Sequence, residues 1–158
     1  MAGTSTTTFS PDMTTTRAMI VTILYRMENE PAATASTFPD VAAGQWYSNA
    51  VAWAAANGIV SGYDNGNFGP EDIITREQMA AILFRYASFK GYDVTKTADL
   101  SAFADAAQVS AYAADAMKWA NAAGLISGTS ATTLAPAGSA TRAQAASILM
   151  RFCENVAK

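Results

Sequence analysis

Three segments of the chain carry apolar residues spaced three and four positions apart, and each would form a helix with one buried face. The positions are Ile20, Ile23, Leu24 and Met27 in the first segment, Met79, Ile82, Leu83 and Tyr86 in the second, and Ala145, Ile148, Leu149 and Phe152 in the third. Three equivalent helices with equivalent apolar faces favour packing around a shared axis.

Each of these segments opens with a Thr-Arg pair, and a second arginine follows nine residues after the first. These two positions hold every arginine of the chain: Arg17 and Arg26, Arg76 and Arg85, Arg142 and Arg151. A glycine lies fourteen residues before the first arginine of each pair and a proline six residues before it: Gly3 and Pro11, Gly62 and Pro70, Gly128 and Pro136. The matching spacings indicate three copies of an internal repeat.

The second and third copies extend further toward the N-terminus than the first. The sequence WAAANGIVSG from Trp53 matches WANAAGLISG from Trp119. These stretches predict a leading helix, which covers residues 48–57 in the second copy and stops at Gly58. The following GYDNGNFGP carries turn signals and predicts a loop, with a minimal hairpin as one form. A complete copy therefore reads as helix, irregular loop, helix, and the first copy lacks its leading half.

The tryptophans divide into two groups by their place in this unit. Trp53 and Trp119 fall in the apolar stripe of the leading helices, so we expect both in the core. Trp46 stands just ahead of its helix, where it could flank a pocket and stack on a ligand.

The arginine of each Thr-Arg pair stands at an electrostatically poor place for a cation. Thr75 and Thr141 are well placed as N-caps, and a glutamine three residues later completes each capping box. Arg76 and Arg142 then occupy the first helical position, where the helix dipole disfavours positive charge.

Two interpretations of this placement remain open. The guanidinium and the unpaired backbone N–H groups of the helix terminus could together hold a carboxylate or phosphate. Alternatively, each arginine bridges to an acidic neighbour such as Asp12, Glu71 or Asp72 and staples one copy to another. The second arginine of each copy lies near a helix C-terminus, which favours a cation, and is interpreted as structural.

Composition narrows the function. The formal charge is −3 with no basic run, which argues against nucleic acid as a partner. There is no histidine and one cysteine, so a zinc site, a disulfide and histidine-based catalysis are not expected, and neither is a cofactor. Asp64, Asn65 and Asn67 match no complete calcium loop. No apolar run is long enough to span a membrane, and the N-terminus lacks a signal-peptide layout. We expect a binding module and not an enzyme.

The combined motifs FPDV, WYSNAVAWAAANGIVSG and NFGPEDIITREQMAAIL resemble the S-layer homology repeat. The resemblance covers the trailing half of a first repeat at 1–30, a second repeat at 36–91 and a third at 100–155, together one globular module. It implies a mainly α fold of tandem helix-loop-helix repeats, arranged as a pseudo-threefold spindle around a central three-helix bundle. It also implies an extracellular module at the bacterial cell surface or wall that anchors a larger protein to anionic secondary cell-wall polysaccharide bearing pyruvate ketals.

The family's Thr-Arg-Ala-Glu motif falls on all three Thr-Arg pairs, but its final acid is absent. Gln78 and Gln144 can replace the acid in capping, whereas we expect that Met19 cannot. The ligand-binding residues that the resemblance implies are Arg17, Arg76, Arg142, Trp46, Asp40 of the FPDV motif, Gly3, Gly62 and Gly128. Arg76 is predicted to be the strongest contact, because its repeat alone retains Trp46, FPDV and the full loop. The third repeat has Tyr112 in place of Trp46, which makes its groove the weaker one.

A structural alternative stands beside glycan binding: the arginines serve only as inter-repeat staples in a module for self-assembly or protein contact. The missing leading half also predicts exposed apolar surface. We expect either a homodimer that completes the missing half repeat or a missing segment that lies in sequence ahead of this chain.

Overall fold

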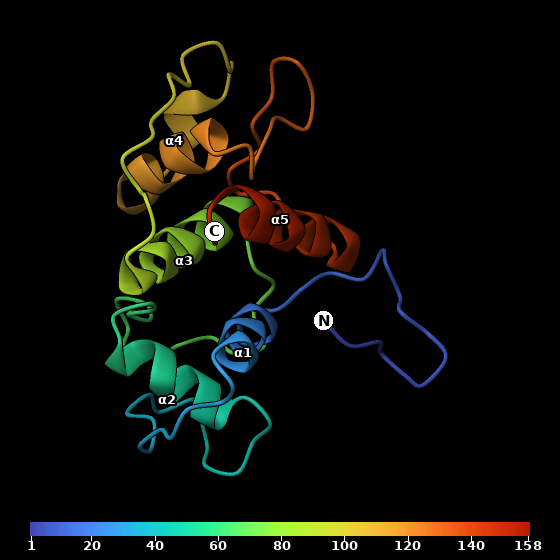
Figure 1. Ribbon diagram of the computed structural model, residues 1–158, viewed down its shortest axis with the longest axis vertical. Helices are drawn as coiled ribbons and strands as arrows, with labels where there is room; N and C mark the ends of the chain where they lie inside the picture. The colour runs from blue at the N-terminus through green and yellow to red at the C-terminus, as the bar shows by residue number, and fades with distance from the viewer. The chain divides into compact units, whose positions relative to one another are not determined.

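The computed structural model describes residues 1–158 and confirms a mainly α fold, with helices, turns and no β-strand (Figure 1). The α-helices are α1 at Arg17–Met27, α2 at Ser48–Ala56, α3 at Arg76–Lys90, α4 at Ala114–Ala122 and α5 at Arg142–Asn155. Two short 3-10 helices, at Ala106–Gln108 and Ala111–Ala113, precede α4. None of the helices has the length and apolar character needed to cross a membrane.

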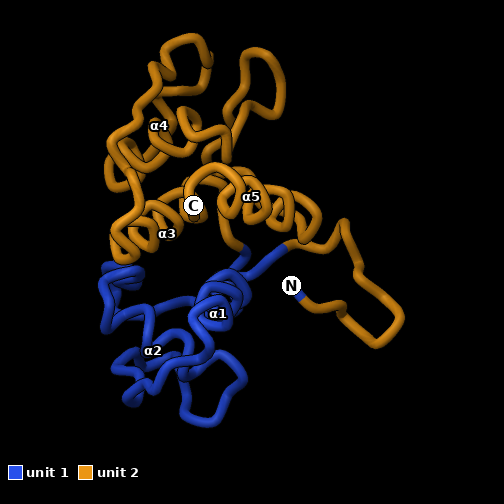
Figure 2. The backbone as a smooth tube through the Cα atoms, viewed as in Figure 1, with its two compact units in different colours: residues 1, 15–73 blue, residues 2–14, 74–158 orange.

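The chain forms two compact units (Figure 2). Unit 1 contains Met1 and Thr15–Ile73, with α1 and α2. Unit 2 contains Ala2–Thr14 and Ile74–Lys158, with α3, α4 and α5. In sequence terms, each unit pairs the trailing helix of one copy with the leading helix of the next.

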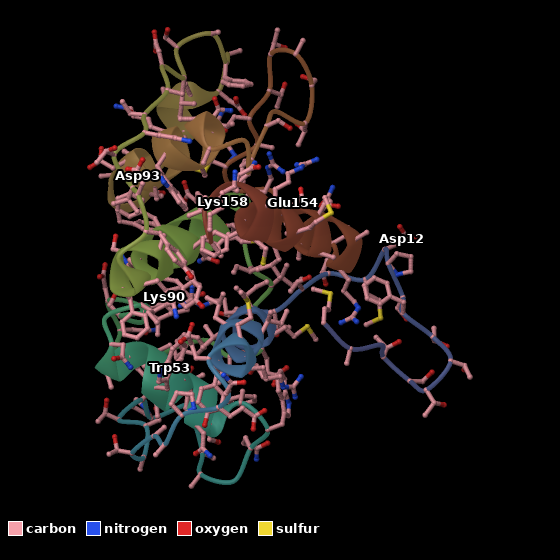
Figure 3. All side chains as sticks on the ribbon, viewed as in Figure 1. Asp12, Trp53, Lys90, Asp93, Glu154 and Lys158 are labelled. Carbon is pink, nitrogen blue, oxygen red and sulfur yellow. The ribbon has the colours of Figure 1, made fainter.

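The core of unit 1 lies between α1 and α2. Ile20, Val21 and Leu24 of α1 are fully buried. The ring of Tyr25 lies 5.7 Å from that of Trp53 on α2, which Figure 3 labels. Trp53 is only 4% exposed, so its predicted place in the core is confirmed.

Unit 2 repeats this arrangement with α3 and α4. The ring of Phe84 on α3 meets that of Trp119 on α4 edge-on at 5.5 Å, and Trp119 is 1% exposed. At the C-terminal end of α3, the ring of Tyr86 lies 5.7 Å from Phe152 of α5, which ties α5 into the same core. Both predicted core tryptophans thus contact an aromatic residue of the preceding copy.

All three trailing helices begin with a capping box, as the sequence predicts for α3 and α5. The expectation that Met19 cannot take part in capping α1 is wrong. The backbone N–H of its N-cap, Thr16, donates to the sulfur of Met19 at 3.5 Å, where α3 and α5 use a glutamine oxygen. A thioether is a weak acceptor, but the flexible Met side chain can place its sulfur over the cap.

The loop of the second copy is a closed turn and not a hairpin with strands. The backbone N–H of Tyr63 donates to the carbonyl of Asn67 at 2.7 Å, and Gly66 donates to Tyr63 at 2.9 Å. The third copy closes its loop in the same way, from Thr129 to the carbonyl of Thr133 at 2.8 Å.

Candidate functional site

The first arginine of each copy donates from Nε to a loop carbonyl of the next copy. The bonds run from Arg17 to Phe68 at 2.9 Å, from Arg76 to Leu134 at 3.0 Å and from Arg142 to Phe9 at 2.9 Å. Each acceptor is the large apolar residue eight positions before the Thr-Arg arginine of its own copy. The third copy returns to the N-terminal loop, so the three contacts follow one another in cyclic order.

The backbone at the start of each trailing helix is held by the same loop. In α3, the N–H of Arg76 donates to the carbonyl of Gly138 at 2.8 Å, and that of Glu77 donates to Pro136 at 3.0 Å. The N–H of Gln78 is taken by the Thr75 hydroxyl at 3.2 Å. The expectation that free N–H groups at this terminus help to hold an anion is therefore wrong, because loop carbonyls and the cap already satisfy them.

The arginine side chains themselves are buried: Arg17 and Arg142 are 6% exposed and Arg76 is 7% exposed. A second nitrogen, Nη2, donates from Arg76 to the carbonyl of Ser127 and from Arg142 to that of Ala2. Burial lowers the pKa of Arg76, and the nearby carboxylate of Asp105 opposes this shift.

The copies are therefore stapled together, but for Arg76 and Arg142 the acceptors are carbonyl oxygens. The hydrogen bonds of Arg76 and Arg142 thus go to backbone carbonyls and not to acidic side chains such as those of Asp12, Glu71 and Asp72.

Aromatic side chains complete two of these contacts. The guanidinium carbon of Arg17 lies 4.6 Å from the ring centre of Tyr63 and 4.8 Å from that of Phe68. That of Arg142 lies 4.9 Å above Phe9. Contacts at this range are favourable cation–π interactions, so the loops hold the arginines by stacking as well as by hydrogen bonds.

The loop that the second repeat retains contacts a different arginine from the one predicted to be the strongest contact, Arg76. The loop of the second copy, which carries Phe68, binds Arg17. Arg76 instead binds Ser127 and Leu134 in the loop of the third copy. The retained loop of the second repeat therefore supports Arg17, and the site at Arg76 depends on the third repeat.

A cleft of about 360 Å³ opens beside Arg76 in unit 2. The third copy supplies the rest of its lining: Leu125, Ile126, Ser127, Gly128, Thr129, Ala143, Gln144, Ser147, Ile148 and Arg151. Two predicted site residues, Arg76 and Gly128, thus meet in one cleft. Sequence reasoning missed Arg151, although the recurrence of an arginine at its position in every copy was a signal.

Arg151 is only partly fixed. Its Nη1 lies 3.5 Å from the carbonyl of Leu125, at the limit of a hydrogen bond. A guanidinium so weakly tied can turn toward a ligand. The cleft therefore combines one anchored and one adjustable cation with hydroxyl and amide groups.

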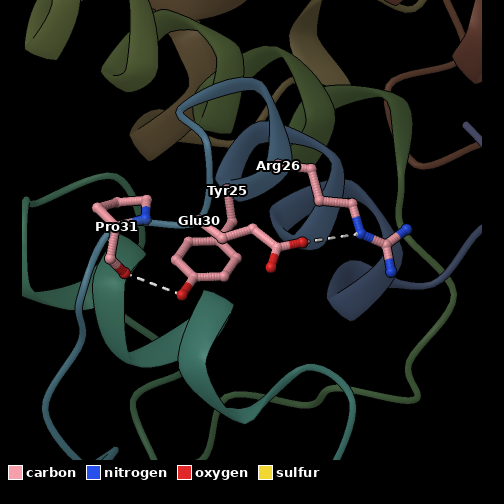
Figure 4. Close-up of polar contacts among 4 residues, drawn as sticks. All are labelled: Tyr25, Arg26, Glu30 and Pro31. Atoms are coloured by element: carbon pink, nitrogen blue, oxygen red, sulfur yellow. Dashed lines mark hydrogen bonds and ion pairs between the residues drawn. The ribbon is translucent and has the colours of Figure 1, made fainter.

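A smaller cleft of about 210 Å³ in unit 1 is lined by Met1, Ile23, Arg26 and Met27. Three of these residues match lining positions of the larger cleft by repeat spacing, since Met1 corresponds to Ile126, Ile23 to Ile148 and Arg26 to Arg151. Figure 4 shows that Arg26 also pairs with Glu30, from Nε to Oε1 at 3.7 Å, next to the bond from the Tyr25 hydroxyl to the carbonyl of Pro31. An exposed pair of this kind adds little stability, so Arg26 is not committed to it.

The side chain of Asp40 caps backbone N–H groups in the loop of the second copy. Its two carboxylate oxygens accept the backbone N–H groups of Phe68 at 2.9 Å and Gly69 at 2.7 Å. Asp105 does the same in the third copy, where both N–H groups lie at 2.8 Å. These N–H groups, and then Arg76, hold the pKa of Asp105 below its usual range.

The predicted glycines lie where the loops close tightly. A Cβ on Gly62 would approach the Phe38 ring to 2.6 Å, and one on Gly128 would approach the Phe103 ring to 2.7 Å. A Cβ on Gly3 would approach the carbonyl oxygen of Thr8 to 2.6 Å. These positions exclude any side chain, so the glycines define the shape of the loops.

Trp46 is 54% exposed, and its ring meets that of Tyr47 edge-on at 5.1 Å. Its surface is therefore open to a ligand. No cluster of three or more His, Cys, Asp or Glu side chains that could hold a metal ion is present in residues 1–158.

The S-layer homology domain matches residues 37–80 and 102–146, which together exceed half of the chain. The chain belongs to this family. S-layer homology domains are cell-wall-anchoring modules of surface proteins and bind cell-wall polymers, so this chain is an extracellular module of the cell surface or wall.

The chain is similar to parts of several larger proteins. It is 35% identical to an amylopullulanase of Thermoanaerobacterium thermosulfurigenes, over 96% of this chain and 8% of that protein. It is 34% identical to the exoglucanase XynX of Acetivibrio thermocellus, over 96% of this chain and 14% of that protein. A surface-layer 125 kDa protein of Lysinibacillus sphaericus is 35% identical over 64% of this chain and 8% of that protein. The chain thus spans only a small part of the length of each of these relatives.

Proposed function

We propose that this chain is a non-catalytic module that anchors a larger surface protein to an anionic secondary cell-wall polysaccharide. The ligand's carboxylate, as on a pyruvate ketal, binds in the cleft between Arg76 and Arg151. The observation that carries the proposal is the meeting of two guanidinium groups in one polar cleft. Arginine forks suit a carboxylate, and a charge-assisted pair of bonds is about twice as strong as a neutral one.

The fixed geometry of Arg76 supports this role. Its Nε and Nη2 are engaged by the carbonyls of Leu134 and Ser127, which leaves Nη1 for a ligand at the cleft. A cation held in place before binding loses little side-chain entropy when the anion arrives. Burial that lowers its pKa also reduces the water that a carboxylate must displace.

The remaining lining suits a sugar. Ser127, Thr129, Gln144 and Ser147 supply hydroxyl, amide and carbonyl groups, and Leu125, Ile126 and Ile148 supply apolar surface. Among the other predicted ligand residues, exposed Trp46 can stack on a sugar ring. Gly3, Gly62, Gly128 and Asp40 act by shaping the loops, and Arg17 and Arg142 take the position of Arg76 in the other two copies.

We also propose how the helices of the repeats are arranged. The three trailing helices form a central bundle with pseudo-threefold symmetry, and the leading helices lie around it. Support comes from the three matching staples, each of which joins an arginine to the loop of the next copy. A homodimer that completes the missing half repeat also remains a prediction, and light scattering would report about twice the 16.5 kDa chain mass.

The structural alternative has its own support, because internal carbonyls accept hydrogen bonds from both Nε and Nη2 of Arg76 and of Arg142. It predicts a module that assembles with itself or contacts proteins without binding glycan.

Sedimentation with purified cell-wall sacculi, before and after extraction of their secondary polymer, separates the two functions. We expect the chain to sediment with intact sacculi and to remain in solution once the polymer is removed. Equal sedimentation with both preparations, or with neither, would contradict glycan anchoring. A third preparation tests the carboxylate itself: intact sacculi are treated with mild acid, which removes the pyruvate. Binding of the chain that survives this treatment would contradict recognition of the ketal.

A further inference from the structure

Asn65 and Gly66 lie in the loop that follows α2, and both residues are exposed (Figure 1). A Cβ built on Gly66 would meet nothing within 4 Å, its chain neighbours aside. An asparagine followed by glycine can lose its side-chain amide, because glycine has no side chain to keep its backbone nitrogen away from the asparagine Cγ. The other two loops have no asparagine at this position: the residue is Thr6 in the first copy and Ala131 in the third.

The side chain of Asn65 is folded forward over the peptide bond that would react. Its Oδ1 accepts the backbone N–H of Asn67, two residues later, at 3.0 Å. This Asx-turn encloses the backbone nitrogen of Gly66 and brings the Cγ of Asn65 next to it. The N–H donor also stabilises the negative charge that develops on Oδ1 when the Cγ is attacked. The turn thus holds the two reacting atoms close together before the reaction begins.

A second Asn-Gly pair, Asn57 and Gly58, is held differently. It follows the last residue of α2, and the Nδ2 of Asn57 donates to the carbonyl of Trp53 at 2.8 Å. This bond ties the side chain back along the helix and holds the nitrogen that would have to leave. The N–H of each glycine donates to a carbonyl three residues earlier, at 3.1 Å for Gly58 and 2.9 Å for Gly66. The two pairs therefore differ in the position of the asparagine side chain.

We propose that Asn65 is a site of spontaneous deamidation and that the reaction loosens the contact between Arg17 and the loop of the second copy. The nitrogen of Gly66 gives its proton to hydroxide and bonds to the Cγ of Asn65. The Cγ–Nδ2 bond breaks, and Nδ2 takes a proton from water and leaves as ammonia, which regenerates the hydroxide. Water then opens the cyclic imide at either carbonyl carbon, and the product is aspartate or isoaspartate. This modification does not depend on the glycan-binding proposal.

Isoaspartate lengthens the main chain of a loop that closes tightly. The N–H of Tyr63 donates to the carbonyl of Asn67 at 2.7 Å, and the isoaspartate linkage adds a methylene group to the backbone between these residues. The ring of Tyr63 lies 4.6 Å from the guanidinium carbon of Arg17, and the carbonyl of Phe68 accepts the Nε of Arg17 at 2.9 Å. These contacts of Arg17 are therefore positioned by the segment that changes length.

Peptide mapping by mass spectrometry, after the folded chain is aged in mildly alkaline buffer, tests the site. We expect Asn65 to deamidate at least about tenfold faster than Asn57, because Asn57 must first break its hydrogen bond to the helix. In concentrated urea the two pairs should react at similar rates, because the contacts that distinguish them are lost. Equal rates in the folded chain, or slower reaction at Asn65, would overturn the assignment. A ratio that is unchanged in urea would mean that local sequence and not the turn sets the rate.

Two variants test the link to Arg17. Asn65→Ala has no amide to lose at this position and is the control for ageing. We expect ageing to lower the urea midpoint of the wild-type chain and to leave that of Asn65→Ala unchanged. In Arg17→Ala the contact is already absent, so ageing should lower the midpoint by less than about half as much. Arg17→Lys takes its place if Arg17→Ala does not fold. An aged wild-type chain that keeps its midpoint, or an equal loss in the Arg17 variant, would contradict the loosening of this contact.

Discussion

The Nε of Arg76 donates a hydrogen bond of 3.0 Å to the carbonyl oxygen of Leu134, in the next copy of the repeat. The same side chain lines the cleft proposed to bind the glycan. One arginine therefore joins two copies and faces the ligand, so substitutions at this position act on stability and on binding together.

Arg76→Ala should destabilise the fold by about 1 to 3 kcal/mol, because it leaves the buried carbonyl of Leu134 without a donor and removes the partly buried hydrogen bond to Ser127. Arg76→Lys should recover only part of this loss, because one ammonium group cannot reproduce the planar fork. Urea unfolding followed by circular dichroism measures both. Equal stability of wild type and Arg76→Ala would mean that the staple contributes nothing.

Arg151→Gln should weaken binding to wall polymer by about 1 to 2 kcal/mol and leave the unfolding free energy nearly unchanged, because its internal hydrogen bond is long and weak. Binding isotherms with extracted polymer provide the measurement. Lys158→Ala removes one positive charge at the exposed C-terminus and serves as the control. If Lys158→Ala weakens binding to wall polymer by the same amount, the effect of Arg151→Gln is due to the change in net charge and not to a contact in the cleft.

Ala135→Gly should stabilise the chain by about 0.5 to 1 kcal/mol. Ala135 has a φ of +52°, whereas the corresponding residue of the second copy is Gly69, with a φ of +70°. A left-handed conformation costs a non-glycine residue about 1 to 2 kcal/mol, which exceeds the entropic cost of glycine. Thermal unfolding measures the change. Ala137→Gly, at an exposed position two residues away, is the control and should not stabilise the chain. An increase in thermal stability in this control as well would contradict the explanation from the φ angle of Ala135.

Acid should weaken the loop of the third copy. The N–H groups of Leu134 and Ala135 lower the pKa of Asp105, and Arg76 adds to this effect. Because the folded pKa lies below the unfolded one, this stabilisation is complete above the unfolded pKa and is lost as the pH falls through the folded pKa. Asp105→Asn should therefore flatten the decline of stability with acid pH.

Unfolding free energies of Asp105→Asn and wild type at a series of acid pH values measure this difference. Asp64→Asn, at an exposed loop position, is the matched control. An equally steep decline in Asp105→Asn and wild type would show that the paired carboxylate is not responsible.

Local sequence determined the apolar faces of the trailing helices and the N-terminal ends of α3 and α5. Turns of a helix bring residues three and four positions apart together, so the apolar stripes and the Thr75 and Thr141 caps could be read without a structure. The burial of Trp53 and Trp119 followed from the same stripes. The family also followed from sequence, because its motifs recur at fixed spacing.

Only the tertiary structure decided which parts of different copies meet. All three loops have similar sequences, so nothing in the spacing says that Arg76 binds Leu134 of the third copy and leaves Phe68 of the second to Arg17. The choice depends on which leading helix packs on which trailing helix, and that packing brings together residues more than fifty positions apart. Arg151 joined the cleft, and Met150 remained exposed, for the same reason: each depends on its neighbours in space, which local periodicity does not encode.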